Sequence, residues 1–373
     1  MISVEEAFER LAGLVPPPRP VSVPLRQGLH RVLIEPVITD RTQPPFDGSA
    51  MDGYAVRDED AVPGARLRVI DTAQAGRRST AMITPGTAIR IFTGAPVPPR
   101  ATRVVIQEDV VVDGDTITLT ERLDAGRHIR PAGRDFRAGD SLAAPLRLAP
   151  RHIALIAAMN APQIIVGDRP GVAIIATGDE LVEPGQQPGP DQIVSSNAHA
   201  VAALVEAEGG LPLLLPIARD TPESLKTAFD LAAGAQIIVT LGGASVGDHD
   251  LVARVGQDHG LTLDFYKIAM RPGKPLMAGR MGASTLLGLP GNPVSAFVCA
   301  TLFLTPLLRA AQGLPFEPQS TTCCRLGEAL GPNGPRAHYM RAELRDGLAY
   351  PASSQDSSLL SVLSSANLLL VRP

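Results

Sequence analysis

The spacing of apolar residues predicts a short amphipathic helix at the start of the chain. Phe8, Leu11 and Leu14 recur at helical spacing, and Ser3 with Glu6 forms a capping box that favours a helix start. The proline-rich run at 16–20 ends the pattern, because proline breaks a helix interior. We therefore expect a helix over residues 3–14.

Residues 62–123 show the alternation of apolar and polar side chains that is typical of β-strands. The alternation is clearest at 67–70, 88–91 and 110–119. Within the last of these, Asp113-Gly114 favours a tight hairpin turn between two strands. This part of the sequence predicts a small β-rich domain.

From about residue 170 the pattern changes to continuous apolar runs, which indicate strands buried on both faces. The expected strands are at 171–177, 236–241, 263–267 and 285–289. The helical patterns that alternate with them are at 196–208, 222–233 and 293–308. Strands alternating with helices predict a doubly wound, parallel α/β domain.

The predicted fold class is α/β plus β, in a chain of several domains. A connecting domain is expected from residues 1–45 and 130–168, with the first helix free to pack elsewhere. A β-rich domain is expected over 46–129, the α/β domain over 169–312 and a small C-terminal β domain over 313–373.

Composition limits the class of protein. The 373 residues are 45% hydrophobic and 19% charged, which excludes global disorder, and a net charge of −4 leaves no overall basic footprint for nucleic acid. Three cysteines, two of them adjacent, form neither a disulfide framework nor a zinc pattern. The sequence has no signal-peptide run and no uninterrupted apolar run of about 18 residues. We therefore expect a cytoplasmic protein that binds neither membrane nor nucleic acid.

Chemistry-bearing residues gather where three predicted strands end, at 177–180 (TGDE), 242–250 (GGASVGDHD) and 288–295 (GLPGNPVS). Ligands of open α/β sheets bind at these carboxyl ends, and glycines let backbone amides approach a phosphate. The acids would repel a bare phosphate, so they favour Mg²⁺ held jointly by carboxylates and substrate phosphates. Each loop alone is better explained as a simple turn, but three of them at strand ends of one sheet, beside Lys267 and Lys274, favour a metal and phosphate site.

A cationic segment lies between two of these strands. The chain has only three lysines, and two of them, Lys267 and Lys274, flank Arg271. A compact ammonium grips an oxyanion as a point charge, which favours an anion site over a solvated basic turn. Upstream, 44–55 and 90–96 are also rich in small and polar residues, although each is explained equally well as a turn.

In their order along the chain these segments resemble the molybdopterin molybdenumtransferases, the MoeA-type enzymes to which the gephyrin E domain also belongs. The motifs are PPFDGSAMDGYA (44–55), RIFTGAP (90–96), GRD (133–135), TGDEL (177–181), GGASVGDHD (242–250), KIAMRPGKP (267–275) and GLPGNPVS (288–295). Each motif is short, but seven of them in one order, spanning nearly the whole chain, are specific.

The resemblance implies insertion of molybdenum into molybdopterin: adenylyl-molybdopterin and molybdate give molybdenum cofactor and AMP, with Mg²⁺ as cofactor. It also implies an elongated homodimer with a C-terminal barrel-like domain. The α/β molybdopterin-binding domain of one subunit and the β region of its partner would form the active cleft. Further partners that it suggests are the molybdopterin adenylyltransferase and molybdoenzyme apoproteins.

The resemblance also assigns residues, motif by motif. The predicted catalytic residues are Asp52, Thr93 and Asp135, reaching the partner's cleft, and Glu180, Asp220, Asp250, Lys267 and Lys274 in the α/β site. Glu180, Asp220 and Asp250 are also the predicted Mg²⁺ ligands. The predicted substrate- or molybdate-binding residues are Gly243, Ser245, Arg271, Pro290, Asn292, Pro293, Ser295, Arg341 and Ser361. Arg271 departs from the family, which often has lysine there.

Two other classes of protein stay open. A molybdopterin adenylyltransferase shares the α/β domain, but the 44–55 segment and the two β regions are not expected in it. A non-catalytic dimeric scaffold of the same family would keep the fold, although the intact acidic loops favour catalysis. Molybdate and tungstate are nearly isosteric, so the sequence does not distinguish them.

Overall fold

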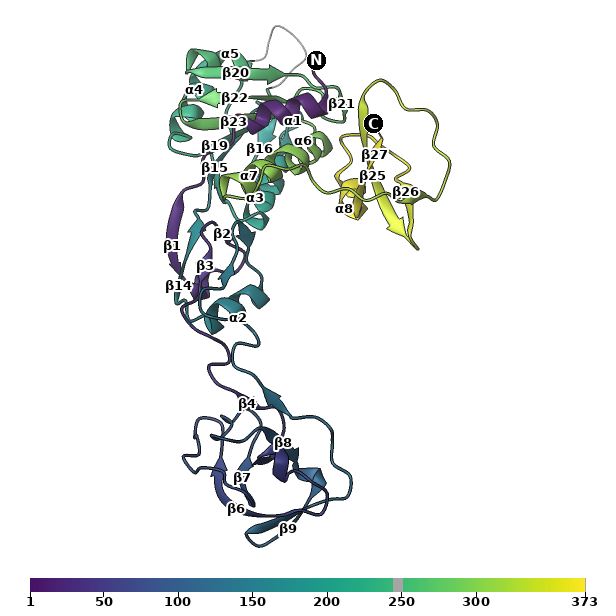
Figure 1. Cartoon of the computed structure of the whole chain (residues 1–373). Helices are drawn as coiled ribbons and strands as arrows, with labels where there is room; N and C mark the ends of the chain where they lie inside the picture. Colours follow the sequence, from purple (N-terminus) through teal and green to yellow (C-terminus); the bar gives the residue numbers. More distant parts are fainter. Residues whose placement is uncertain (244–250, 373) are drawn as a thin grey trace. The chain divides into compact units, whose positions relative to one another are not determined.

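The computed structural model describes residues 1–243 and 251–372 (Figure 1). It divides into two compact units. Unit 1 comprises Met1–Glu35, Ala144–Ala149 and Ile165–Pro373, and unit 2 comprises Pro36–Ala143 and Pro150–Ile164. Unit 1 therefore gathers the N-terminal residues with the α/β and C-terminal segments.

The centre of unit 1 is a six-stranded sheet of described residues, in the order β18-β15-β19-β23-β22-β20. Its strands are β15 (Gly171–Ala176), β18 (Leu211–Leu214), β19 (Ile237–Leu241), β20 (Leu261–Tyr266), β22 (Met277–Met281) and β23 (Ser284–Leu289). The first four in this order run parallel, as predicted, whereas β22 pairs antiparallel with both β23 and β20. The sequence does not predict β22, because glycine and arginine interrupt its apolar run.

Helices cover both faces of this sheet, which confirms the doubly wound arrangement. One face carries α1 (Val4–Ala12), α3 (Asn197–Ala207), α6 (Pro293–Cys299) and α7 (Thr305–Ala311), and the other carries α4 (Pro222–Leu231) and α5 (Leu251–Asp258). In β15, Val172 and Ile174 face the first layer, while Ala173 and Ile175 face the second. Successive side chains point to opposite faces, so a strand covered on both sides is apolar throughout.

The predicted N-terminal helix is present as α1 and packs on the α/β sheet. The Ser3 hydroxyl accepts a hydrogen bond from the Glu6 amide at 3.0 Å, as the capping box requires. Ala7 and Leu11 are fully buried in the α/β core. Burial of a leucine side chain contributes about 2 kcal/mol, so this face holds α1 on the sheet.

The helix predicted over 293–308 runs as α6, a π-helical segment at Ala300–Leu304 and α7. This run, Pro293–Ala311, is the one helix among the described residues that is long and apolar enough to cross a membrane. However, 78% of its apolar window is buried inside the protein, as expected of a core helix.

The rest of unit 1 is β-rich. A four-stranded sheet joins β1 (Pro20–Pro24), β14 (Gln163–Gly167), β2 (Val32–Leu33) and β13 (Leu146–Arg147), and a short pair joins β16 (Leu181–Val182) and β17 (Ile193–Val194). The C-terminal sheet contains β21 (Met270–Arg271), β24 (Arg325–Leu326), β25 (Ala337–Arg345), β26 (Leu348–Pro351) and β27 (Leu368–Arg372), with α8 (Leu360–Ser365) beside it. Because β21 pairs with β25, the cationic segment is part of the C-terminal sheet.

Unit 2 contains the predicted β-rich domain. Its larger sheet consists of β5 (Gly53–Val56), β6 (Arg66–Ala73), β7 (Thr87–Ile91), β8 (Arg103–Ile106), β9 (Val110–Asp113) and β10 (Thr116–Leu119). The β9–β10 hairpin confirms the turn predicted at Asp113-Gly114. The unit also holds β3 (Val37–Ile38) paired with β12 (Ser141–Leu142), β4 (Gly48–Ser49) paired with β11 (Ile129–Arg130), and α2 (Pro150–Ala158).

Candidate functional site

The loops that follow β15, β19 and β23 open into one pocket of about 1110 Å³. We call it the carboxyl-end pocket, because it lies where the parallel strands end. The predicted site residues that line it are Glu180, Asp220, Gly243, Lys274, Pro290, Asn292, Pro293 and Ser295. Residues separated by more than a hundred positions in the sequence are therefore brought to one place by the sheet.

The loop after β15 is held in a folded-back shape. Gly178 has φ of 148°, and a Cβ there would lie 2.5 Å from Glu180 Oε2, so only glycine fits. Arg219 Nη1 donates to the carbonyl oxygens of Gly178, Asp179 and Leu181 at 3.1 to 3.3 Å. These contacts position the Glu180 carboxylate at the pocket.

Acidic side chains gather on this wall of the pocket. The Asp220 amide donates to Asp179 Oδ1 at 3.2 Å. Although Asp220 is exposed at the pocket, its partial desolvation, followed by the negative charges of Asp179 and Glu180, raises its pKa above the ordinary value. A divalent cation would relieve this repulsion, so the donor set suits Mg²⁺, which proteins usually hold by one or two carboxylates together with substrate phosphates.

The third predicted metal ligand, Asp250, lies outside the described residues, as does Ser245. Among the residues that are described, no group of three His, Cys, Asp or Glu side chains is arranged to hold a metal ion. Glu180 and Asp220 therefore form the described part of the predicted ligand set.

The three loops at the carboxyl-end pocket pack against one another. Gly242 has φ of 97°, and a Cβ there would lie 2.8 Å from the Thr177 carbonyl oxygen, so the first two loops pack backbone to backbone. From α3, Asn197 Nδ2 donates to the Gly291 carbonyl at 2.6 Å and braces the third loop. The loops thus form one packed unit.

The start of α6 offers fewer free amides than its sequence suggests. Pro293 has no N–H, and the Val294 amide donates to the Ser357 carbonyl at 3.0 Å. The Ala296 amide donates to Asn292 within the helix. Anion binding here would therefore depend more on the side chain of Ser295 than on helix-end amides.

The two lysines of the cationic segment have different surroundings. Lys274 lines the carboxyl-end pocket. Lys267 does not, and its ammonium lies 4.7 Å from the centroid of the Tyr266 ring. Arg271 is exposed on β21 and is also absent from the lining. Of the three cations in this segment, Lys274 is the one that lines the same pocket as Glu180 and Asp220.

Arg341 is buried, with only 1% of its surface exposed. Its Nη1 donates to the Asp356 carbonyl at 2.7 Å and its Nη2 to Gln355 Oε1 at 3.3 Å. The turn that it holds carries Ser358 to the carboxyl-end pocket. Ser361 is exposed on α8 and does not line the pocket. In this structure Arg341 thus acts on the pocket through that turn.

Three predicted residues, Asp52, Thr93 and Asp135, belong to unit 2, whereas the residues that line the carboxyl-end pocket belong to unit 1. Asp52 Oδ1 accepts from the Thr93 amide and from the Thr93 hydroxyl, each at 2.7 Å. These bonds lower the pKa of Asp52, so it is a fixed anion at neutral pH. Asp135 is exposed in the same unit.

The sequence prediction missed several lining residues: Ser195, Ser196, Asn197, Arg254 and Ser358. Arg254 adds a cation from α5 to the pocket lining. The amphipathic pattern of α5 was the only signal in the sequence that could have predicted this position. The serines and Asn197 come from the start of α3 and from the C-terminal turn, where single polar residues give no distinct pattern. Such residues are found only when the chain has folded.

Comparison with known proteins finds matches along most of the chain. Family models match in three regions: the MoeA N-terminal region (domain I and II) at residues 2–160, a probable molybdopterin binding domain at 173–310, and the MoeA C-terminal region (domain IV) at 324–373. The chain belongs to the MoeA-type molybdopterin molybdenumtransferase family. That family is one of transferases.

Individual relatives agree with this assignment. The chain is 38% identical to molybdopterin molybdenumtransferase 2 of Mycobacterium tuberculosis over 84% of its own length and 81% of the relative's. It is 37% identical to the molybdopterin molybdenumtransferase of a Nostoc species over 92% and 82%. A crystal structure of the molybdopterin biosynthesis MoeA protein from Pyrococcus horikoshii OT3 matches all of this chain and 95% of that one, with a TM-score of 0.86 and 27% identity.

The three matched regions of this MoeA-type chain divide the predicted site residues among them. Asp52, Thr93 and Asp135 fall in the N-terminal match, and the carboxyl-end pocket is built mainly from the central match. Arg341 and Ser361 fall in the C-terminal match. The resemblance stated from seven short motifs is therefore confirmed over the whole chain.

Proposed function

We propose that this protein inserts molybdenum into molybdopterin, using adenylyl-molybdopterin and molybdate as substrates and releasing AMP in the presence of Mg²⁺. The observation that carries the proposal is the carboxyl-end pocket, which is lined by Glu180, Asp220 and Lys274. The pKa of Asp220 is raised by its desolvation and by nearby acids, including Glu180. In such a pocket the carboxylates would bind a divalent cation, and the lysine would bind the phosphate of the substrate.

The residues of the pocket suit this chemistry. Bound Mg²⁺ would neutralise phosphate charge during cleavage of the phosphoanhydride. Lys274 and Ser295 supply a point charge and a hydroxyl to the anionic groups of the substrates. The reaction needs positioning and charge neutralisation more than a protein nucleophile. The volume of about 1110 Å³ leaves room for a ligand larger than most drug-sized molecules.

A direct test measures AMP release from adenylyl-molybdopterin with Mg²⁺, with and without molybdate. Wild type is expected to release AMP only with molybdate, and Asp220→Asn to lose that release. Asp258→Asn, an exposed acid at the end of α5, serves as the matched control and is expected to keep wild-type activity. Molybdate-independent release would indicate a hydrolase-like relative, and no release by wild type would favour the scaffold alternative.

The proposal includes a homodimer whose active site is shared. In unit 2 the ionised Asp52 carboxylate is held by two hydrogen bonds from Thr93, whereas the pocket lies in unit 1. The second copy would supply this carboxylate and its threonine. Mixing inactive Asp52→Asn with inactive Asp220→Asn subunits tests this, because half of randomly formed dimers would contain one intact site. Roughly a quarter of wild-type activity is expected on these statistics of a two-fold dimer. No recovery after verified subunit exchange would contradict the shared site.

Partnership with the adenylyltransferase and molybdoenzyme apoproteins stays a prediction of the resemblance. The cytoplasmic location stays a prediction of the sequence composition, and Mg²⁺ as the cofactor stays a prediction of the acidic loops and of the resemblance.

A further inference from the structure

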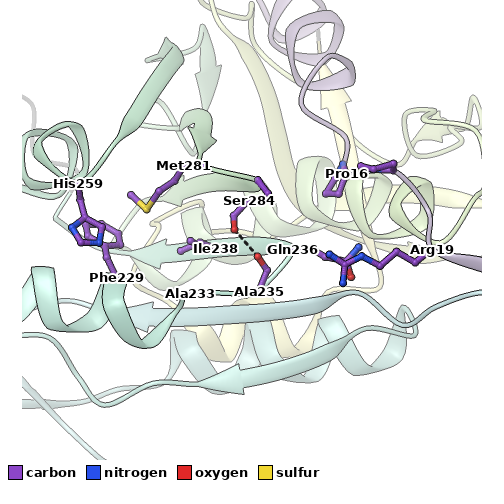
Figure 2. Close-up of a pocket in the computed structure, with 14 residues that line it drawn as sticks. Pro16, Arg19, Phe229, Ala233, Ala235, Gln236, Ile238, His259, Met281 and Ser284 are labelled. Carbon is purple, nitrogen blue, oxygen red and sulfur yellow. Dashed lines mark hydrogen bonds between the residues drawn. The ribbon is translucent and has the colours of Figure 1, made fainter.

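A second pocket, of about 430 Å³, lies at the other end of the same sheet (Figure 2). Gln236 directly precedes β19 and Ser284 begins β23, so the pocket sits where these strands start. We call it the amino-end pocket. The five residues of β19, at about 3.3 Å each, separate it from the carboxyl-end loops by roughly 16 Å.

One end of the amino-end pocket is a flat, apolar surface. The rings of Phe229 and His259 stack with centroids 5.9 Å apart and 23° between their planes. Phe229, Ile238 and Met281 are 2%, 2% and 9% exposed, so they belong to the fixed core of the domain. His259 Nε2 lies 3.2 Å from Asp230 Oδ1, which sets the orientation of the ring.

The opposite end is polar, as Figure 2 shows for Arg19 and Gln236. Gln236 is only 8% exposed, yet its side-chain amide makes no hydrogen bond to any described residue. Its backbone is held by bonds to Gly171 and Thr285, so the side chain projects from a rigid position. The Gln236 amide is not one of the fully enclosed, unpartnered polar groups of the described residues, so it is open to the pocket and available to a ligand there.

Charge at this end favours an anion. The Arg19 guanidinium is exposed and forms no ion pair or hydrogen bond with the described residues. Ser284 Oγ donates its one O–H to the Ala235 carbonyl at 2.6 Å, so Arg19 and Gln236 are left as the donors for an anion at this end. None of the described lining residues is Asp or Glu. An anionic group beside Arg19 would thus meet a cation and no opposing carboxylate on the wall.

We propose that the amino-end pocket binds a small amphipathic anion: a carboxylate carried on a flat aromatic ring. The carboxylate pairs with Arg19 and the Gln236 amide, and the ring lies against Phe229, His259 and Met281. The volume matches the lower part of the usual range for small-molecule sites. Because the pocket is at the strand starts, its occupant does not compete with ligands of the carboxyl-end pocket.

The experiment titrates the full-length protein, labelled with ¹³C at the methionine methyl groups, with 1-naphthoate. The Met281 signal, assigned with Met281→Leu, is expected to shift saturably. The neutral analogue 1-naphthamide is expected to bind at least about tenfold more weakly, since it lacks the charge-assisted bond to Arg19. Arg19→Met should weaken naphthoate binding by about tenfold and leave naphthamide binding unchanged.

Two matched variants complete the design. Arg26→Met removes an exposed arginine outside the pocket and should leave naphthoate binding unchanged. Asp220→Asn should also leave it unchanged, because Asp220 belongs to the carboxyl-end pocket. The proposal is overturned if Met281 shows no saturable shift, if naphthamide binds as tightly as naphthoate, if Arg19→Met has no effect, or if Asp220→Asn weakens binding.

Discussion

The two ends of the central sheet contrast in how their pockets are built. At the strand ends, contiguous loops supply acids and glycines, and each loop can be recognised as a short motif in the sequence. At the strand starts, the wall is assembled from single residues such as Arg19, Gln236 and His259, which come from separate segments. One sheet thus presents two pockets: one with Glu180 and Asp220 in its lining, for which we propose a metal and phosphate, and one with Arg19 in its lining, for which we propose a small anion. A motif reveals the first kind of site, and only the folded chain reveals the second.

The largest expected effect is a loss of activity when an acid of the carboxyl-end pocket is changed, without an effect on the amino-end pocket. Glu180→Gln or Asp220→Asn should lower molybdate-dependent AMP release by at least about 100-fold, because either change removes a negative charge from the predicted Mg²⁺ site. Naphthoate binding at the amino-end pocket should not change. Measuring both properties on the same preparation makes the comparison direct. Retained activity in both variants would contradict the assigned acidic site.

The next prediction compares two lysines of one segment. Lys274→Met should lower kcat/KM by about 10- to 100-fold, because this ammonium faces the carboxyl-end pocket. Lys267→Met should cost less than about tenfold, since Lys267 lies over the Tyr266 ring outside the lining. Steady-state kinetics at several molybdate concentrations would distinguish them. Equal losses would show that Lys267 reaches the substrates after all.

A pair of glycines, one at each end of the sheet, gives a third test. Gly178→Ala should lower activity by about tenfold or more, because its Cβ would displace the Glu180 carboxylate. Gly234 lines the amino-end pocket with φ of 89° and nothing within 4 Å of a Cβ. Gly234→Ala should therefore cost about 1 kcal/mol in the free energy of unfolding and spare activity. Chemical denaturation and the AMP assay measure the two effects separately.

A smaller effect is expected where this chain departs from its family. Arg271→Lys should leave activity within about tenfold of wild type, because charge is kept and the side chain lies outside the carboxyl-end pocket. The variant is assayed at saturating and at low molybdate. A larger change in either direction would mean that the guanidinium itself contacts a substrate.

The smallest effect concerns unit 2, which holds neither pocket. Thr93→Val removes one of two hydrogen bonds to Asp52 and should raise the pKa of that carboxyl toward its ordinary 3.8. The hydrogen bonds from Thr93 stabilise the ionised form of Asp52. Their contribution to the free energy of unfolding is therefore fully present above pH 3.8 and is lost as pH falls through the lowered pKa of Asp52. Carboxyl ¹³C titration by NMR of wild type and Thr93→Val measures this. An unchanged Asp52 pKa would show that the hydroxyl bond does not form in solution.

The elements that the sequence predicted were those with local signals. The Ser3 cap, the β9–β10 turn and the apolar run of β15 each depend on neighbouring residues, and all three are present. Strand β22 has no such signal, and its antiparallel pairing is decided by the strands beside it. For the site, the loops could be predicted, whereas the inward burial of Arg341 could not, because its partners lie 14 and 15 residues away in a turn.

The sequence by itself determined the family and the loops at the strand ends, since a loop that binds phosphate must keep its glycines and acids together along the chain. Tertiary structure alone decided which of the candidate cations lines the pocket with Glu180 and Asp220, which arginine is buried, and that a second pocket exists at the strand starts. The physical reason is that periodicity and turn chemistry act between near neighbours. A pocket wall instead depends on contacts between residues far apart in the chain, which form only when the sheet and its helix layers pack.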